Sequence, residues 1–179
     1  EAVSQEVQLY EEMISYLEEV TGKEIDFFMP TNRASVTEAQ INGFVDIAVH
    51  GPYSYIMAHD LDSSIEVFAT YAKKEGILQK EGPGYQSVLI TRKDSGFDDV
   101  ESLKGKILGL ADPASTSGNL VPRVVFGRDA LGGMELEKYF SKAVYTGGHD
   151  LTTMAGRDGK IDAGFVATHR FDNVIDLGK

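Results

Sequence analysis

Three consecutive hydroxyl side chains, Ser115, Thr116 and Ser117, are followed by Gly118 in the middle of the chain. The preceding residues 106–111 have the apolar composition of a buried parallel strand, and the residues after the hydroxyls can form a helix. The hydroxyls therefore fall at a helix N-terminus, where N–H groups lack intrahelical partners and the macrodipole favours negative charge. Such a loop can wrap a tetrahedral oxyanion. An ordinary N-cap, for which one hydroxyl suffices, is the alternative.

Four further side chains are candidate ligands for an anion. His149 follows two glycines and precedes a predicted helix, so its imidazole can donate to an anion and gains charge when one binds. Tyr85 offers a phenol directly after a Gly-Pro-Gly sequence. His50 ends a predicted strand, where ligands gather in open α/β sheets, and Arg33 at a loop-to-helix junction can pair bidentately with an oxyanion. For each of them, a purely structural or solvent-exposed role is the alternative.

The elements that must position these side chains alternate between helix and strand, which predicts an α/β fold with a mainly parallel sheet. Strands are predicted at 24–29, 45–49, 65–70, 85–91, 106–111, 143–145 and 161–166. Helices are predicted at 7–20, 97–104, 120–130, 135–140 and 151–157, and two more helices are predicted to end at about residue 42 and at residue 58. The polar, glycine-bearing stretch 73–84 is the best candidate for a loop at a lobe boundary. We therefore expect a first lobe at 1–86, a second lobe at 87–166, and in 167–179 the start of a return to the first lobe.

Composition excludes several classes of function. The 179 residues contain no cysteine, which excludes disulfides and thiolate chemistry, and the net charge of −11 argues against nucleic acid as a partner. There is no membrane-spanning apolar run and no signal segment, and the four histidines have no metal-ligand spacing. Neither a nucleotide P-loop nor a Gly-x-Ser-x-Gly elbow is present. From these missing motifs and the histidine spacing, neither a cofactor nor a metal is expected.

One pattern occurs twice. Residues 43–48 and 159–164 both read glycine, any residue, a β-branched residue, aspartate, any residue, and a small residue. The repetition is consistent with two α/β lobes built on one plan, and coincidence is the alternative.

The sequence from Asp112 to Gly118, with Pro122 after it, resembles the signature of the phosphonate/phosphite/phosphate family of ABC-transporter substrate-binding proteins. Other segments agree with that family in the same order along the chain: 45–48 before Gly51-Pro52, 84–90, 93–96, 103–106, 148–150 and 161–164. The resemblance implies a type II periplasmic-binding fold, in which two α/β lobes close on a ligand. By the family pattern, the phosphonate group would be held by Ser115, Thr116, Ser117, His149 and Tyr85.

The chain departs from that pattern at three places. Arg33 stands where the family has a tyrosine, Val49-His50 replaces an aromatic pair, and His169 takes the position of the glutamate that binds the ligand amine in aminoethylphosphonate binders. Family members also begin with a strand before the first helix and continue well past Lys179. The resemblance therefore implies a first lobe that is truncated at both ends, and the chain is expected to be either an excerpt of a longer protein or a shortened relative.

The expected function is capture of a small phosphorus oxyanion outside the cytoplasm, for delivery to an ABC-transporter permease. The protein would be a periplasmic or extracytoplasmic binding protein, free or lipid-anchored, and not an enzyme. A ligand-sensing domain of a signalling receptor, or an enzyme acting on a phosphorylated metabolite, are the alternatives.

Overall fold

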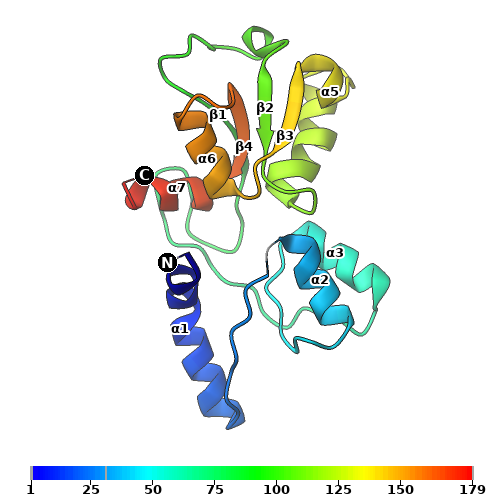
Figure 1. Cartoon of the computed structure of the whole chain (residues 1–179), viewed down its shortest axis with the longest axis vertical. Coiled ribbons are helices and arrows are strands. Elements are labelled where there is room, and N and C mark those ends of the chain that lie inside the picture. Colours follow the sequence, from blue (N-terminus) through cyan, green and yellow to red (C-terminus); the bar gives the residue numbers. More distant parts are fainter. Residues whose placement is uncertain (1, 31, 179) are drawn as a thin grey trace. The chain divides into compact units, whose positions relative to one another are not determined.

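Helix α1 (Ala2–Thr21) and the extended segment after it form the first of two units in a computed structural model (Figure 1). The structure describes residues 2–30 and 32–178, without the side chains of 2–6 and 9, and the units are Glu1–Thr31 and Asn32–Lys179. Within the first unit, the rings of Tyr10 and Phe27 stack with their centroids 5.8 Å apart. The expected helix at 7–20 is confirmed, and the expected strand at 24–29 is absent.

The second unit is built on a four-stranded sheet with the order β1-β4-β2-β3 (Figure 1). Strand β2 (Ile107–Leu110) pairs in parallel with β3 (Lys142–Tyr145) and β4 (Ala163–Ala167), whereas β1 (Ser87–Thr91) runs antiparallel to β4. The parallel pairing predicted from the alternation of elements is confirmed for β4, β2 and β3. Strand β1 is the antiparallel exception, at the edge of the sheet.

The two faces of the sheet are packed differently, because successive side chains of a strand point to opposite faces. One face carries the main apolar cluster, which contains Leu103, Leu108, Leu110, Leu131, Leu136, Phe140, Ala163 and Phe165. On the other face, Gly109 and Gly164 are paired in register, and α6 (His149–Arg157) packs closely over them. A Cβ atom added at Gly164 would lie 2.6 Å from Thr152 Cγ2, so helix and sheet approach each other only because these positions lack side chains.

A continuous helical run follows β2 and begins at the hydroxyl residues. Its first two segments, η2 (Thr116–Leu120) and η3 (Pro122–Phe126), are π-helical, and α4 (Gly127–Asp129) completes it. The run starts four residues before the predicted helix at 120–130. Leu120 N–H donates to the Ser115 carbonyl at 3.0 Å, the i→i+5 bond of a π-turn. Such turns are rare and are found disproportionately at functional sites.

The remaining helices agree only partly with the sequence. Helices α2 (Arg33–Ile41), α3 (Pro52–Leu61) and α5 (Leu136–Tyr139) lie where they are predicted. The helix expected at 97–104 is reduced to a single 3₁₀ turn, η1 (Glu101–Leu103), and α7 (Thr168–Asp176) was not predicted.

The strands predicted at 45–49 and 65–70 are absent, as is the one at 24–29. A strand exists only through ladder hydrogen bonds to a neighbour, and no segment among the described residues pairs with these three. Their apolar side chains are correspondingly exposed around the predicted strands, as shown by Phe44 at 82% and Phe68 at 72%. None of the helices in residues 2–30 and 32–178 combines the length and apolar character needed to cross a membrane.

Candidate anion-binding site

A cavity of about 300 Å³ in the second unit is bounded by three segments that are distant in the sequence. Its lining residues are Pro52 from α3, Pro83, Gly84, Tyr85 and Ser87 from the approach to β1, and Thr116, Ser117 and Val121 from the π-helical run. Three of the seven candidate residues, Tyr85, Thr116 and Ser117, therefore face one cavity.

The hydroxyl loop is held in place by hydrogen bonds from neighbouring elements. Ser115 Oγ accepts from Gly118 N–H at 3.0 Å, and Thr116 Oγ1 accepts from the backbone N–H of Tyr53 at 2.9 Å. From β1, the Ser87 hydroxyl donates to the Ser117 carbonyl at 2.6 Å. In each case the loop supplies the acceptor, so the protons of the Ser115 and Thr116 hydroxyls are not consumed by these bonds.

Glycine is required at position 118. A Cβ atom there would collide with the Ala111 methyl group and would lie 3.0 Å from both Ser115 Oγ and His149 Cε1. The loop can therefore approach the end of β2 and the imidazole only because Gly118 has no side chain.

The Ser117 hydroxyl is buried, and in the described part of the chain its oxygen has no hydrogen-bond partner. Buried hydroxyls are nearly always paired, and leaving one unsatisfied costs about 1–3 kcal/mol. Because Ser117 is also one of the residues that line the cavity, its unpaired hydroxyl is a candidate partner for a ligand bound there.

His149 lies behind the hydroxyl loop rather than on the cavity lining. Its Nδ1 accepts from the backbone N–H of Ala167 at 3.2 Å, and its Nε2 is 3.3 Å from Ser115 Oγ. Burial, followed by the nearby charges of Arg33 and Arg170, lowers the pKa of the ring to about 3. The imidazolium envisaged from the sequence is thus disfavoured, because the buried ring is neutral in the absence of an anion.

The tautomer of His149 follows from these contacts. A neutral ring that accepts at Nδ1 carries its proton on Nε2, which then donates to Ser115 Oγ. Since Ser115 Oγ also accepts from Gly118, its own proton must point elsewhere.

Arg33 and His50 have different surroundings. A Cβ atom added at Gly51 would lie 3.5 Å from both Arg33 Nη1 and Thr116 Oγ1, so the guanidinium lies close to the hydroxyl loop. His50, in contrast, uses both ring nitrogens within its own neighbourhood, at 3.2 Å from Ser54 Oγ and 2.9 Å from Gln40 Oε1. We interpret His50 as a structural link between α2 and α3.

The loop from Lys73 to Gln86 is fixed by a buried polar network, although its composition is that of a solvated lobe boundary. The Asp172 carboxylate of α7 accepts from the N–H groups of Leu78 at 3.1 Å and Gln79 at 2.8 Å. The Gln79 side chain donates to the Gly84 carbonyl at 2.9 Å and accepts from the Thr168 hydroxyl at 2.6 Å. This network determines where Tyr85 lies.

Tyr85 contacts two polar residues that are not among the seven ligands predicted from the sequence. Its ring meets the His169 ring edge to face, with centroids 5.1 Å apart, and the Lys73 ammonium lies 5.1 Å from its centroid. Lys73 is missed because nothing in a polar loop marks one lysine as buried. His169 is marked only as a departure from the family pattern.

The chain is similar to a known family of proteins and to individual members of it. The family described as "ABC transporter, phosphonate, periplasmic substrate-binding protein" matches residues 1–179. The chain is 34% identical over 173 residues to the phosphate-import protein PhnD of Mycolicibacterium smegmatis, covering 93% of this chain and 51% of that protein. It is 30% identical over 166 residues to the phosphonates-binding periplasmic protein of Escherichia coli, covering 90% and 45%. The chain thus spans about half the length of the curated relatives it matches.

Solved structures show the fold. A binding protein component of an ABC phosphonate transporter from Pseudomonas aeruginosa superposes with a TM-score of 0.79 at 24% identity, covering 100% of this chain and 57% of that one. PhnD1 from Prochlorococcus marinus, in complex with methylphosphonate, superposes with a TM-score of 0.75 at 20% identity, covering 97% and 63%. The described α/β structure with its open sheet therefore corresponds to part of a type II periplasmic-binding fold.

Proposed function

Since the chain belongs to the family of ABC-transporter phosphonate periplasmic substrate-binding proteins, we propose that its cavity holds the tetrahedral head of a small phosphorus oxyanion. The relatives are named for phosphate, for phosphonates and for methylphosphonate, which share a tetrahedral phosphorus with anionic oxygens. The protein would act outside the cytoplasm, free or lipid-anchored, and deliver its ligand to the permease of an ABC importer.

The observation that carries this proposal is the buried hydroxyl of Ser117, which has no hydrogen-bond partner among the described residues and belongs to a residue that lines the cavity. The hydroxyls of Ser115 and Thr116 keep their own protons, and the first N–H groups of the helical run have no intrahelical partners. The Arg33 guanidinium adds positive charge beside these donors. Together these groups can surround an oxyanion in a protein whose net charge is −11.

The geometry favours binding over catalysis. A histidine that activates a serine must accept the hydroxyl proton on the nitrogen that faces the serine. The Nε2 of His149 already carries a proton, because Nδ1 accepts from Ala167 N–H. The ring therefore orients Ser115 as a donor and does not act as its base.

Removing the Ser117 hydroxyl tests this proposal. We expect Ser117→Ala to weaken binding of phosphate or methylphosphonate by about 10- to 150-fold, since a hydrogen bond to a charged group contributes about 1.5–3 kcal/mol. The melting temperature of the unliganded protein should be unchanged or slightly higher, because the removed hydroxyl satisfies no partner in the described structure. Calorimetry and thermal unfolding of the protein at its natural length measure the two effects.

Ser141→Ala is the matched control, because this exposed serine lies before β3 and donates to the Lys106 carbonyl. Its affinity for the same anions should equal that of the wild type. Equal affinities in Ser117→Ala and the wild type would remove the hydroxyl loop from the site, and failure of the wild type to bind any phosphorus oxyanion would overturn the proposed function.

A further inference from the structure

Lys73 and His169 both contact the ring of Tyr85, a residue that lines the cavity of the proposed oxyanion site, and we call these three residues the Lys73 wall. Resting on that proposed function, we infer that this Lys73 wall selects ligands without an ammonium group, so that the site takes doubly charged phosphorus oxyanions and rejects aminoalkyl zwitterions. Four observations support this selectivity.

The first observation is that Lys73 is a buried cation without an anionic partner. Its side chain and backbone together are only 8% exposed, and Nζ donates to the backbone carbonyl of Pro83 at 2.9 Å. No carboxylate among the residues described lies within ion-pair distance of this ammonium. Burial of an unpaired charge is unfavourable and is offset when a counter-charge arrives. An anionic ligand supplies that counter-charge.

The second observation places the ammonium against the cavity. Nζ lies 4.3 Å from the ring centroid of Tyr71 and 5.1 Å from that of Tyr85, distances at which a cation is attracted to an aromatic face. Tyr85 and Pro83, two of the groups that contact the ammonium, both line the cavity. The positive charge is therefore held next to residues that line the cavity.

The third observation concerns the ring on the other side of Tyr85. His169 Nδ1 is buried and has no hydrogen-bond partner among the described residues. Burial, followed by the charges of Arg170, Lys73 and Arg33, lowers the pKa of this ring to about 4. The ring is neutral at ordinary pH, and a neutral imidazole cannot form the ion pair with a ligand amine that a carboxylate forms.

The fourth observation is that the Asp172 carboxylate, which acts on His169, already accepts hydrogen bonds from the backbone. Asp172 is the one carboxylate that acts on His169 in the described part of the chain, and it raises the pKa of the ring. Its oxygens accept from the N–H groups of Leu78 and Gln79. Asp172 therefore holds the loop and is not free to pair with a ligand ammonium.

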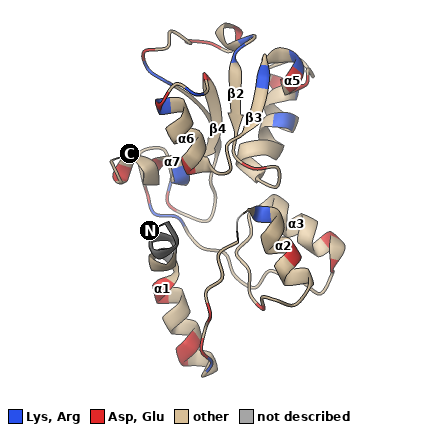
Figure 2. Cartoon of the chain, in the orientation of Figure 1, with Lys and Arg blue, Asp and Glu red and all other residues tan. Residues whose placement is uncertain are grey.

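Basic residues from three elements act electrostatically on His169, which contacts the lining residue Tyr85. Arg33 begins α2, Arg170 lies in the first turn of α7, and Lys73 lies in the loop before β1; Figure 2 shows basic positions at the starts of both helices. A doubly charged anion bound in the cavity is attracted by each of these positive charges. An ammonium group on the ligand meets the like charge of Lys73, which disfavours the wrong partner.

The experiment compares ethylphosphonate with 2-aminoethylphosphonate, which differ only in the ammonium group, by calorimetry on the protein at its natural length. We expect the wild type to bind ethylphosphonate about tenfold or more tightly than the aminated ligand. Lys73→Met, which preserves the length of the side chain, should weaken ethylphosphonate binding and bring the ratio of the two affinities close to one. Lys74→Met, the exposed neighbour in the same loop, should leave the ratio unchanged.

A second variant does not require the loss of a buried side chain. His169→Glu adds a carboxylate beside Tyr85 and should shift the affinity ratio toward the aminated ligand by about tenfold or more. The shift in ratio is measurable in this variant even where Lys73→Met fails to fold.

The outcomes separate the two proposals. Equal affinities for both ligands in the wild type, or a preference for the aminated one, would overturn the selectivity and leave the oxyanion site standing. An unchanged ratio in folded Lys73→Met and in His169→Glu would remove the Lys73 wall from ligand selection. Failure of the wild type to bind phosphate or either phosphonate would overturn the proposed function itself.

Discussion

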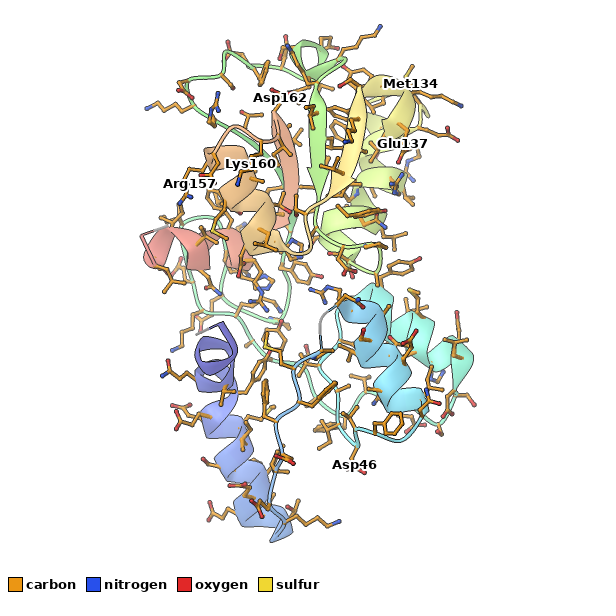
Figure 3. All side chains as sticks on the ribbon, viewed as in Figure 1. Asp46, Met134, Glu137, Arg157, Lys160 and Asp162 are labelled. Carbon is orange, nitrogen blue, oxygen red and sulfur yellow. The ribbon has the colours of Figure 1, made fainter. Side chains whose placement is uncertain are left out.

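Residues 43–48 and 159–164 share one pattern of residue types, yet only the second segment leads into a strand. After Gly159, Ile161 is buried and β4 begins at Ala163. After Gly43 no strand forms, and Ile47 is 45% exposed. Figure 3 shows Asp162 at the start of β4 beside β2, and Asp46 on a loop without an adjacent strand.

The difference lies in the neighbour and not in the local sequence. Asp162 is joined to β2 at two points, because its N–H donates to the Ile107 carbonyl at 2.9 Å and its carboxylate accepts from the Ile107 N–H at 2.8 Å. No described residue offers such pairing to the segment around Asp46. A single extended segment gains too little from its own side chains to form a strand alone.

Hydrogen exchange should show the largest contrast. Amides of β2 and β4 are expected to exchange about a thousandfold or more slowly than those of residues 45–49, because ladder-bonded core strands open only by global or subglobal unfolding. Mass spectrometry of deuterated peptides measures both segments in one sample. Equal protection would mean that residues 45–49 are paired after all.

Truncation of the β-branched residue should give the next largest contrast. Ile161→Ala is expected to lower the free energy of unfolding by about 2–4 kcal/mol, because its Cδ1 fills the space that Gly109 and Gly164 leave open. Val45→Ala, at the equivalent position of the other segment, should lower it by less than about 1 kcal/mol, since that side chain is only half-buried. Urea denaturation of both variants tests the pair, and equal losses would contradict it.

The smallest contrast is expected at the shared aspartate. Asp162→Ala leaves the Ile107 N–H without its acceptor and should lower the free energy of unfolding by about 1–2 kcal/mol. Asp162→Asn keeps an acceptor oxygen and should recover part of that loss. Asp46→Ala should change the free energy of unfolding by less than about 0.5 kcal/mol. The same denaturation experiment applies, and a loss in Asp46→Ala as large as that in Asp162→Ala would show that this carboxylate also has a partner.

Much of the candidate site could be predicted, because its signals are local. The hydroxyl loop joins an apolar strand to a helix, and strand, loop and helix start are adjacent in the sequence. Tyr85 follows a Gly-Pro-Gly turn directly before β1. Residue types and their spacing are sufficient where the parts of a site are neighbours along the chain.

Other parts of the site could not be predicted, because their partners are distant in the sequence. Gln79 bonds to Thr168, and Asp172 bonds to Leu78, across about ninety residues. The charge state of His149 likewise depends on burial and on the charges of Arg33 and Arg170, which a linear pattern does not express.

The sequence by itself determined the α/β class, the parallel core strands and the hydroxyl loop, because hydrophobic periodicity and helix-terminus chemistry act within a few residues. Only the tertiary structure decided which predicted strands form, since pairing needs a partner in space. It also decided that Lys73 is buried, that His149 is neutral and that the Ser117 hydroxyl has no partner among the residues the structure describes. Burial and hydrogen bonding at these residues are set by groups brought together from distant parts of the chain.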